Sequence, residues 1–346
     1  MKIFIIYNHP CTGLGQTTLK YIDLITQLGH EVICREFVEY FYDMKDGNPV
    51  VKQKIDFYKA DVLFVNIAPM HDVLHHIKDL TQYYKRNMAM MVWETEEVPQ
   101  IMIRWANLFN HILTPSLYCL NIFNKVIDNQ FTFVPHHVPN IKWDISQIRP
   151  RLKTLMNNKK YKFYTIGNMA DKRKNLDFLI KGFLECNFDN AMLFIKVQSY
   201  DKVDISGKNI YVVDDVLISN EEISYIHDKC DCYISTSYSE GVGLGIVEAA
   251  NHGNPVIMTD YGGQNDYVKT DYLIDTRIDM IGFDYGYFTS NMTWGHPNYD
   301  TYVKLLKNVY NSKVKNQDHR KTVNMSENPR YISMQLNKVL RENSTA

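Results

Sequence analysis

The chain has 346 residues, of which 45% are hydrophobic and 22% are charged, so its composition is that of an average globular protein. This length buries enough surface for two cores of ordinary domain size, which excludes a single small module, a disordered chain and a coiled coil. The 38 basic and 39 acidic residues give a net charge of −1, so we expect no nucleic-acid partner, and any bound phosphate must be held by local groups.

Short apolar runs alternate with amphipathic stretches in the first half of the chain, which is the pattern of a parallel sheet covered by helices. The first apolar run covers residues 3–7 and is too short for a signal-peptide core or a membrane span. No later run approaches the roughly eighteen apolar residues of a transmembrane helix, so we expect a cytoplasmic protein without a transmembrane segment. Strands are predicted over residues 2–7, 31–37, 62–67, 88–93, 112–114 and 131–134.

Residues 145–160 read ISQIRPRLKTLMNNKK, a polar and basic stretch interrupted by Pro150, with few residues able to fill a core. This composition predicts a domain boundary, with an N-terminal Rossmann-like domain on the acceptor side over residues 1–150 and a C-terminal one on the donor side over residues 151–328. Residues 329–346 carry one more helical pattern. Periodicity leaves its placement open, including a return to the N-terminal domain.

The α/β pattern restarts after this boundary. Strands are predicted over residues 162–167, 192–198, 210–213, 231–235 and 255–259, and helices over residues 176–186, 220–229 and 244–252. Two such units of similar size predict an α/β protein in which two Rossmann-like domains with parallel sheets face each other across a cleft.

A glycine-rich segment, STSYSEGVGLGIVE at residues 235–248, lies between a predicted buried strand and a predicted helix. Gly241, Gly243 and Gly245 let the backbone come close to a ligand. The helix that follows directs free N–H groups and the positive end of its dipole at this loop. Such a turn also occurs without any ligand, but here it predicts a site for a phosphate or diphosphate.

Two carboxylates flank this loop, and we expect them to have different roles. Glu248 lies about one turn into the helix, from which its side chain can accept hydrogen bonds from a vicinal diol such as a ribose. Glu240 precedes the glycines and would face whatever is attached beyond the phosphates. The presence of both glutamates argues strongly against a purely structural role for this turn.

A basic cluster, IGNMADKRKN at residues 166–175, also follows a predicted strand and leads into a predicted helix. Lys172, Arg173 and Lys174 stand where cations oppose the helix dipole and cost stability. A diphosphate shared with the Glu240 loop would explain them, and a solvated helix start is the alternative.

The combination of GNMADKRKN, SEGVGLGIVEA and NHGNPVIMTDYGG resembles the retaining glycosyltransferases of family 4, which have the type B double-Rossmann fold. The resemblance covers residues 161–268, about a third of the chain. It implies that Glu240 and Glu248 form the Glu-x7-Glu motif, with the first at the donor sugar and the second on the ribose, and that Lys174 is catalytic. The expected donor-binding set is Gly167, Asn168, Arg173, Val216, Gly241, Gly243, Leu244, Gly245 and Glu248, joined by Gly13 and Gly15.

One position departs from the family pattern. Asn168 stands where the family has an arginine, which removes a phosphate ligand. Arg173 could compensate as a bidentate phosphate partner, although neighbouring positions on a helix face different ways.

The first half offers weaker candidates. Residues 9–16, HPCTGLGQ, resemble the family loop that closes over the donor or acceptor, with Gly13 and Gly15 supplying flexibility, and they match neither a dehydrogenase fingerprint nor a Walker loop. Glu94 stands near the place where the family often has a histidine, so it could orient an acceptor hydroxyl or lie in a solvated loop. His136 could line the cleft or be structural.

Metal binding is not expected. His71 and His75 have the spacing of a helical zinc pair, but no third ligand is evident. The six cysteines form no Cys-x-x-Cys pair, which argues against a zinc ribbon or a disulfide framework and favours a reducing cytosol, and Cys230 and Cys232 are expected to be small buried hydrophobic residues.

The resemblance therefore implies a retaining glycosyltransferase that moves a hexose, mannose or glucose, from GDP-mannose or a UDP-hexose to a hydroxyl group on a glycan, lipid or protein. The absence of an Asp-x-Asp sequence predicts that the reaction needs no metal or other cofactor. A non-catalytic binder of nucleotide sugars or carbohydrates and a nucleotide-sugar epimerase on the same fold are the alternatives. The sequence does not specify the oligomeric state.

Overall fold

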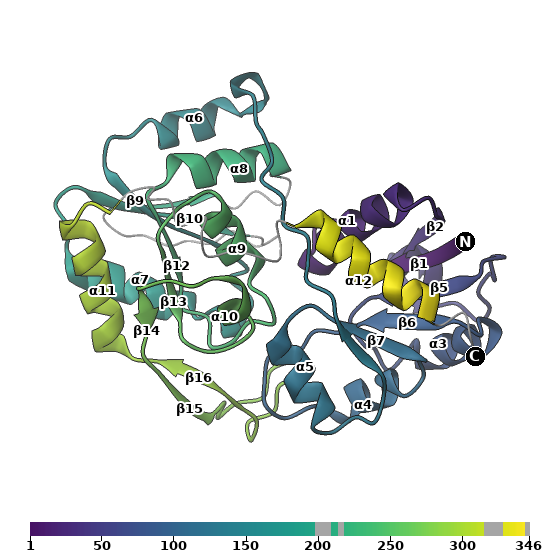
Figure 1. Ribbon diagram of the computed structural model, residues 1–346. Coiled ribbons are helices and arrows are strands. Elements are labelled where there is room, and N and C mark those ends of the chain that lie inside the picture. The colour runs from purple at the N-terminus through teal and green to yellow at the C-terminus, as the bar shows by residue number, and fades with distance from the viewer. Residues whose placement is uncertain (198–208, 214–217, 315–327, 343–346) are drawn as a thin grey trace. The chain divides into compact units, whose positions relative to one another are not determined.

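The computed structural model describes residues 1–197, 209–213, 218–314 and 328–342 (Figure 1). The chain divides into two compact units. The first comprises Met1–His137 with Asn328–Ala346, and the second comprises Val138–Glu327.

The described part of the first unit contains a six-stranded sheet in the order β2-β1-β5-β6-β7-β8, with every pair parallel. Its strands are β1 (Lys2–Tyr7), β2 (Glu31–Glu36), β5 (Val62–Asn66), β6 (Asn87–Met90), β7 (His111–Thr114) and β8 (Phe131–Phe133), and β3 (Tyr42–Lys45) with β4 (Asn48–Val51) forms a separate hairpin. Its helices are α1 (Gly13–Gln27), α2 (Phe37–Phe41), α3 (Leu74–Tyr83), α4 (Gln100–Ala106), α5 (Leu117–Asn124) and α12 (Pro329–Glu342).

The C-terminal helix α12 belongs to this first unit. Ile332, Leu336, Val339 and Leu340 recur at helical spacing and are buried in the core of the first sheet, together with Ile3 and other strand residues. The helix packs against α1 and β8, and Figure 1 shows it in yellow beside α1. An amphipathic stripe of this kind is stabilised by the core that it covers.

The described part of the second unit contains a six-stranded parallel sheet in the order β11-β10-β9-β12-β13-β14. Its strands are β9 (Tyr161–Gly167), β10 (Ala191–Val197), β11 (Ile210–Val213), β12 (Cys232–Ser235), β13 (Val256–Thr259) and β14 (Leu273–Ile274), followed by the antiparallel pair β15 (Thr276–Met280) and β16 (Thr293–Pro297). Its helices are α6 (Pro150–Met156), α7 (Leu176–Cys186), α8 (Asn220–Lys229), α9 (Leu244–Asn251), α10 (Gln264–Tyr267) and α11 (Tyr299–Asn311), with 3-10 turns η1 (Ile145–Gln147) and η2 (Lys172–Lys174).

These two parallel sheets confirm the predicted α/β class with two Rossmann-like halves. The second sheet has the 3-2-1-4-5-6 strand order of dinucleotide-binding folds, so the order reverses between β9 and β12. Ligands of such sheets bind at the carboxyl ends of the strands on either side of this reversal. The fold therefore marks the ends of β9 and β12 as the place to look for a site.

The division between the units falls thirteen residues before the boundary that the composition predicts, between His137 and Val138. The stretch that reads as a polar linker contributes Ile148, Leu152 and Met156 to the core of the second unit. Pro150 starts α6 instead of breaking a helix, because a proline at the first helical position loses no hydrogen bond. Helix α6 is thus short and mostly polar on its exposed side, and Leu152 and Met156 attach it to the core of the second unit.

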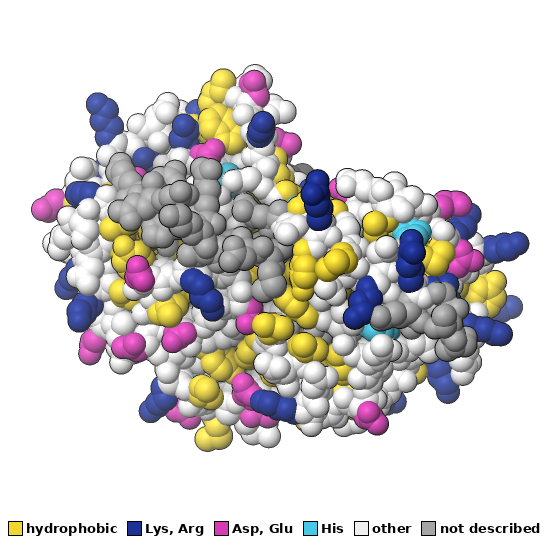
Figure 2. Space-filling model, viewed as in Figure 1, with side chains coloured by type: hydrophobic (Ala, Val, Ile, Leu, Met, Phe, Trp, Pro, Cys, Tyr) yellow, Lys and Arg dark blue, Asp and Glu magenta, His cyan; other side chains and the backbone are white. Residues whose placement is uncertain are grey.

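The surface carries both signs of charge. Figure 2 shows lysine and arginine side chains interspersed with acidic ones over the visible face. Among the described residues, no helix is long and apolar enough to cross a membrane.

Candidate functional site

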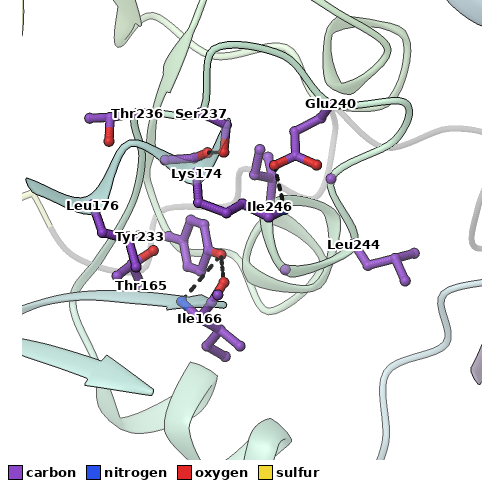
Figure 3. Close-up of a pocket in the computed structure, with 14 residues that line it drawn as sticks. Thr165, Ile166, Lys174, Leu176, Tyr233, Thr236, Ser237, Glu240, Leu244 and Ile246 are labelled. Carbon is purple, nitrogen blue, oxygen red and sulfur yellow. Dashed lines mark hydrogen bonds and ion pairs between the residues drawn. The ribbon is translucent and has the colours of Figure 1, made fainter. Parts of the chain in front are cut away.

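A cavity opens where the strand order of the second sheet reverses (Figure 3). About 340 Å³ of space lies between the carboxyl ends of β9 and β12 and the first turn of α9. Its lining residues are Thr165, Ile166, Gly167, Lys174, Leu176, Tyr233, Ser235, Thr236, Ser237, Glu240, Gly243, Leu244, Gly245 and Ile246.

Tyr233 builds the floor of this cavity. β9 and β12 pair at Cys232 and Tyr233, and beyond them the Tyr233 hydroxyl accepts a hydrogen bond from the Ile166 amide at 3.4 Å and donates one to the Ile166 carbonyl at 3.2 Å. Gly245 rests on the same hydroxyl, since a Cβ there would lie 2.5 Å from its oxygen. The helix N-terminus can therefore sit directly against the strands.

The N-terminus of α9 forms one wall. Gly243 caps the helix with a φ of 74°, a left-handed conformation that glycine adopts without strain. No side chain caps this end, so the first N–H groups of α9 stay available at the cavity. Together with the helix dipole, they favour an anion at this wall.

Glu240 lies beside this wall, is 6% exposed and stands between two cations. Lys174 Nζ is 2.6 Å from its Oε1, and Arg173 Nη1 is 2.9 Å from its Oε2. Figure 3 draws the Lys174 contact as a dashed line. Burial would raise the pKa of Glu240, but the charges of Arg173 and Lys174 and a hydrogen bond from Ser237 lower it to about 2. Glu240 is therefore a permanent carboxylate at neutral pH.

Arg173 supports Glu240 and does not line the cavity. Its side chain is 10% exposed, and the guanidinium donates to the Ser239 carbonyl at 2.5 Å and pairs with Asp171 at 3.0 Å. The residue lies in η2, and the left-handed conformation of Asn175 at the end of that turn separates η2 from α7. In this structure Arg173 thus contacts Glu240 and its neighbours, and its contact with a phosphate stays a prediction.

Some of the other residues that were predicted to bind the donor sugar line the cavity, and others do not. Gly167, Gly243, Leu244 and Gly245 line it, whereas Gly241 and Asn168 do not. The Asn168 side chain accepts a hydrogen bond from the Ala170 amide at 3.0 Å and closes a local turn.

Two further predicted donor residues lie outside this lining. Glu248 lies on α9 beyond the lining residues, with a side chain that is 31% exposed. Val216 lies outside the described residues.

The candidates in the first unit have structural partners. Gly13 begins α1, which is capped by the Thr12 side chain, and Gly15 packs so tightly that a Cβ would lie 2.1 Å from the His9 carbonyl oxygen. Gly15 therefore serves close packing, where flexibility was expected. Glu94 is partly exposed, between β6 and α4.

His136 lies in the core of the first unit. Its side chain is 3% exposed, and its Nδ1 is 2.8 Å from the Tyr21 hydroxyl. Burial lowers the pKa of His136 to about 3, so the ring is uncharged at neutral pH. A ring buried in this way has a structural role, which is one of the two roles that the sequence left open.

The metal candidates do not come together. His71 and His75 are exposed, and among the described residues no group of three or more histidine, cysteine or acidic side chains forms a metal-binding cluster. Cys230 and Cys232 are buried, as expected for small hydrophobic residues, and burial raises the pKa of both thiols.

Sequence reasoning missed the hydroxyl groups of the cavity. Tyr233, Ser235, Ser237 and Thr165 all contribute to the lining. The run STSYSEG at the end of β12 was a readable signal, because hydroxyl side chains just beyond a buried strand are well placed to bind a polar ligand.

A known family matches the part of the chain that contains this cavity. Residues 160–280 match the sequence model of the family described as Glycosyl transferases group 1. This segment includes every residue that lines the cavity. This part of the chain therefore resembles a group 1 glycosyltransferase domain.

A curated relative matches part of the chain. Over 168 residues, the chain is 27% identical to the GtfA subunit of the UDP-N-acetylglucosamine–peptide N-acetylglucosaminyltransferase of Streptococcus pneumoniae serotype 4. The match covers 46% of this chain and 33% of that protein, so the chain spans about a third of the length of this relative.

Solved structures resemble the whole chain. Sucrose-phosphate synthase from Thermosynechococcus elongatus superposes with a TM-score of 0.71 at 11% identity, over 99% of this chain and 98% of that one. HepE of Anabaena, solved in complex with UDP-glucose, superposes with a TM-score of 0.61 at 13% identity, over 99% and 98% of the two chains. At such identities, the likeness shows the fold, which is the type B fold of glycosyltransferases.

Proposed function

We propose that this protein is a retaining glycosyltransferase of family 4 that transfers a hexose from a nucleoside-diphosphate sugar to a hydroxyl group of an acceptor. The observation that carries the proposal is the buried Glu240 carboxylate paired with Lys174, at a cavity that is also lined by an uncapped helix N-terminus. A cation and free N–H groups suit the leaving diphosphate, and a permanent carboxylate suits the hydroxyl groups of the sugar.

The diphosphate would bind against α9. The N–H groups of Gly243, Leu244 and Gly245 line this wall, and the Lys174 ammonium is the cation that lies in the lining. Preorganised donors of this kind stabilise charge that grows during the reaction. Because the side chain of Asn168 carries no charge, the diphosphate would depend more strongly on Lys174 than it would with an arginine at that position.

Glu240 would hold the sugar. As a buried carboxylate, it can only accept hydrogen bonds, and sugar hydroxyls are the donors that the cavity would bring to it. Arg173 would act through Glu240 by keeping the carboxylate ionised and fixed in place. Glu248 lies about one turn into α9 and would accept hydrogen bonds from the two ribose hydroxyls.

We propose that the reaction uses these groups in the following way. The bond between the anomeric carbon and the diphosphate oxygen breaks, and its electron pair leaves with the diphosphate. The acceptor oxygen forms a bond to the same face of the anomeric carbon, and its proton passes to an oxygen of the departing diphosphate. Lys174 and the α9 N–H groups stabilise the leaving charge without a metal ion, so activity is expected to persist in the presence of a chelator.

A uridine donor is our first choice. The curated relative is named for UDP-N-acetylglucosamine, and a structural neighbour was solved with UDP-glucose, whereas GDP-mannose remains the second choice. The free cysteines of the described chain support a reducing, cytoplasmic location. The acceptor remains open among glycan, lipid and protein.

Calorimetric titration tests the donor site. UDP, UDP-glucose, UDP-N-acetylglucosamine and GDP-mannose are titrated into the wild-type protein and into Lys174→Ala. We expect micromolar binding of one nucleotide family and a loss of at least tenfold in Lys174→Ala. Failure of the wild type to bind any of the four would overturn the proposal.

A second candidate is a binding protein without transfer activity, which Asn168 favours because it removes a charge expected near the diphosphate. Incubation of the preferred donor with candidate acceptors, followed by mass spectrometry, separates the two. Sugar transfer or slow donor hydrolysis supports the enzyme. Donor binding with no sugar release under any acceptor supports the binding protein, and an altered free donor indicates an epimerase.

A further inference from the structure

A buried histidine lies behind Glu248. His227 on α8 is fully buried, with Nδ1 2.7 Å from the Tyr164 hydroxyl and Nε2 3.6 Å from Glu248 Oε2. Burial lowers the pKa of His227, although Glu248 partly opposes this, so the ring carries one proton at neutral pH. The position of that proton decides what the ring can do for Glu248.

The surrounding hydrogen bonds determine the tautomer. The Asn254 side-chain amide donates one hydrogen to the His227 carbonyl at 2.6 Å and the other to the Tyr164 oxygen at 2.7 Å. The single hydrogen of the Tyr164 hydroxyl is then left to point at His227 Nδ1. Nδ1 is therefore an acceptor, and the proton of the ring must lie on Nε2, directed at Glu248.

The plane of this ring is held from the other side. His252 stacks on His227 with ring centroids 5.2 Å apart and an angle of 21°. Its Nδ1 is 2.6 Å from Asp228 Oδ1. Asp228 in turn accepts a hydrogen bond from the Trp143 indole at 2.5 Å. The His227 ring thus has little freedom to turn away from Glu248.

Among the described residues, no group forms a hydrogen bond with His227 Nε2, although this atom is fully buried. A buried donor without a partner costs stability, so its position needs an explanation. Glu248 is the acidic group that faces it, and 3.6 Å is slightly too long for a hydrogen bond. Contacts of this kind often shorten when the substrate arrives.

We propose that His227 is a positioning residue that directs the Glu248 carboxylate toward the ribose of the donor, with Tyr164 and Asn254 fixing the tautomer that does so. This inference rests on the proposed function, because it assumes a nucleotide whose ribose meets Glu248. A donor bond to one carboxylate oxygen leaves the other oxygen of Glu248 directed at the two ribose hydroxyls.

The test compares UDP with 2′,3′-dideoxy-UDP, which has no ribose hydroxyls. Both are titrated into the wild type, His227→Phe, His227→Gln, Tyr164→Phe and Glu248→Ala. We expect His227→Phe to weaken UDP binding about tenfold and dideoxy-UDP binding hardly at all. His227→Gln, which keeps an N–H donor near the Nε2 position, should retain most of the affinity, and Tyr164→Phe should lose part of it.

Coupling to Glu248 completes the test. In the Glu248→Ala background, His227→Phe should have no further effect on UDP binding. An equal loss for UDP and dideoxy-UDP, or no loss for UDP, would overturn the role of His227 while leaving the donor site standing. Wild-type protein that binds neither nucleotide would overturn the proposed function itself. Should His227→Phe fail to fold, the comparison of His227→Gln with Tyr164→Phe gives the same decision.

Discussion

The strand order of each sheet reverses at one point, between β1 and β5 in the first unit and between β9 and β12 in the second. In the first unit, neutral groups pack together at this point. The Asn66 amide donates to the Thr18 hydroxyl at 2.8 Å, and Gly15 packs against the His9 carbonyl. In the second unit the same point holds a cavity, and Glu240 lies there between two cations.

This difference between the two reversal points indicates the role of the charges at Glu240, Arg173 and Lys174. A buried ion pair seldom stabilises a fold more than well-packed neutral residues do, because the desolvation of both charges opposes their attraction. The first unit shows that this type of sheet can close its reversal point with uncharged hydrogen bonds. The cost of the charges in the second unit is therefore best explained by a ligand that needs them.

The largest expected effect comes from removing the central charge. Glu240→Gln keeps the shape of the side chain but leaves Arg173 and Lys174 without their carboxylate, so we expect transfer to fall roughly 10³-fold, as for loss of a principal stabilising group. Initial rates with the preferred donor measure this. Near wild-type turnover would show that the charge in the second unit has no role in the reaction and would remove the functional meaning of the comparison.

A smaller loss is expected from Lys174→Ala. Loss of a charge-assisted contact to the diphosphate should weaken UDP binding by about 30-fold, while binding of uridine, which has no phosphate, should stay unchanged. Lys172→Ala is the matched control, because Lys172 lies in the same turn but over the ring of Phe283, 5.1 Å from its centre. Equal effects of the two substitutions would indicate a general basic surface instead of a specific ligand.

Arg173 separates the two roles considered for it. If the guanidinium positions Glu240, Arg173→Lys should lower kcat about tenfold and leave the KM for the donor within about twofold, since the lysine keeps the charge but cannot contact Ser239, Asp171 and Glu240 together. Steady-state kinetics at varied donor concentration measures both constants. A rise in KM with unchanged kcat would support a direct phosphate contact.

Much of the fold was readable from the sequence. The helices predicted over residues 176–186 and 220–229 have those bounds, and the predicted strands of both sheets differ from the observed ones by a few residues. Hydrophobic periodicity carries this information because each of these elements buries one face. Strands β14, β15 and β16 at the end of the second unit were not predicted. β14 has only two residues, and β15 and β16 pair outside the main sheet. Helix α11 was missed, although Tyr302, Leu306 and Val309 mark its buried face at helical spacing.

The site was readable in part. The two motifs predicted that Glu240 and Lys174 share a crevice, and the structure places Lys174 Nζ 2.6 Å from Glu240 Oε1. The direction of Arg173 was not readable, because it depends on the 3-10 turn and the left-handed Asn175 that follow β9. His136 was undecided for a similar reason, since its partner Tyr21 lies 115 positions away in the sequence. Local patterns therefore located the motifs, and long-range contacts decided which side chains face the ligand.

The smallest effect on activity is expected at His136, whose protonation at low pH should destabilise the first unit. The pKa of His136 is lowered from the ordinary value of 6.5 to about 3, so the unfolded chain binds a proton that the folded chain rejects, and stability is lost as the pH falls from about 6.5 towards 3. At pH 5 this loss is about 2 kcal/mol. His136→Asn keeps a hydrogen-bonding group for the Tyr21 hydroxyl but cannot be protonated, so this variant should lose less stability than the wild type between pH 7 and pH 5.

Glu240 provides the contrast, because its pKa is lowered from 4.5 to about 2, and the stability that it contributes is lost only below about pH 4.5. Hydrogen exchange of the amides in each sheet at pH 7, 5.5 and 5 measures the two units separately. The first sheet of the wild type should lose protection in this range relative to that of His136→Asn, and the transfer rate at pH 7 should be unchanged. Equal losses in wild type and variant would mean that the His136 ring does not stay buried and uncharged in this pH range. The contrast between uncharged buried groups in the first unit and buried charges in the second would then be lost.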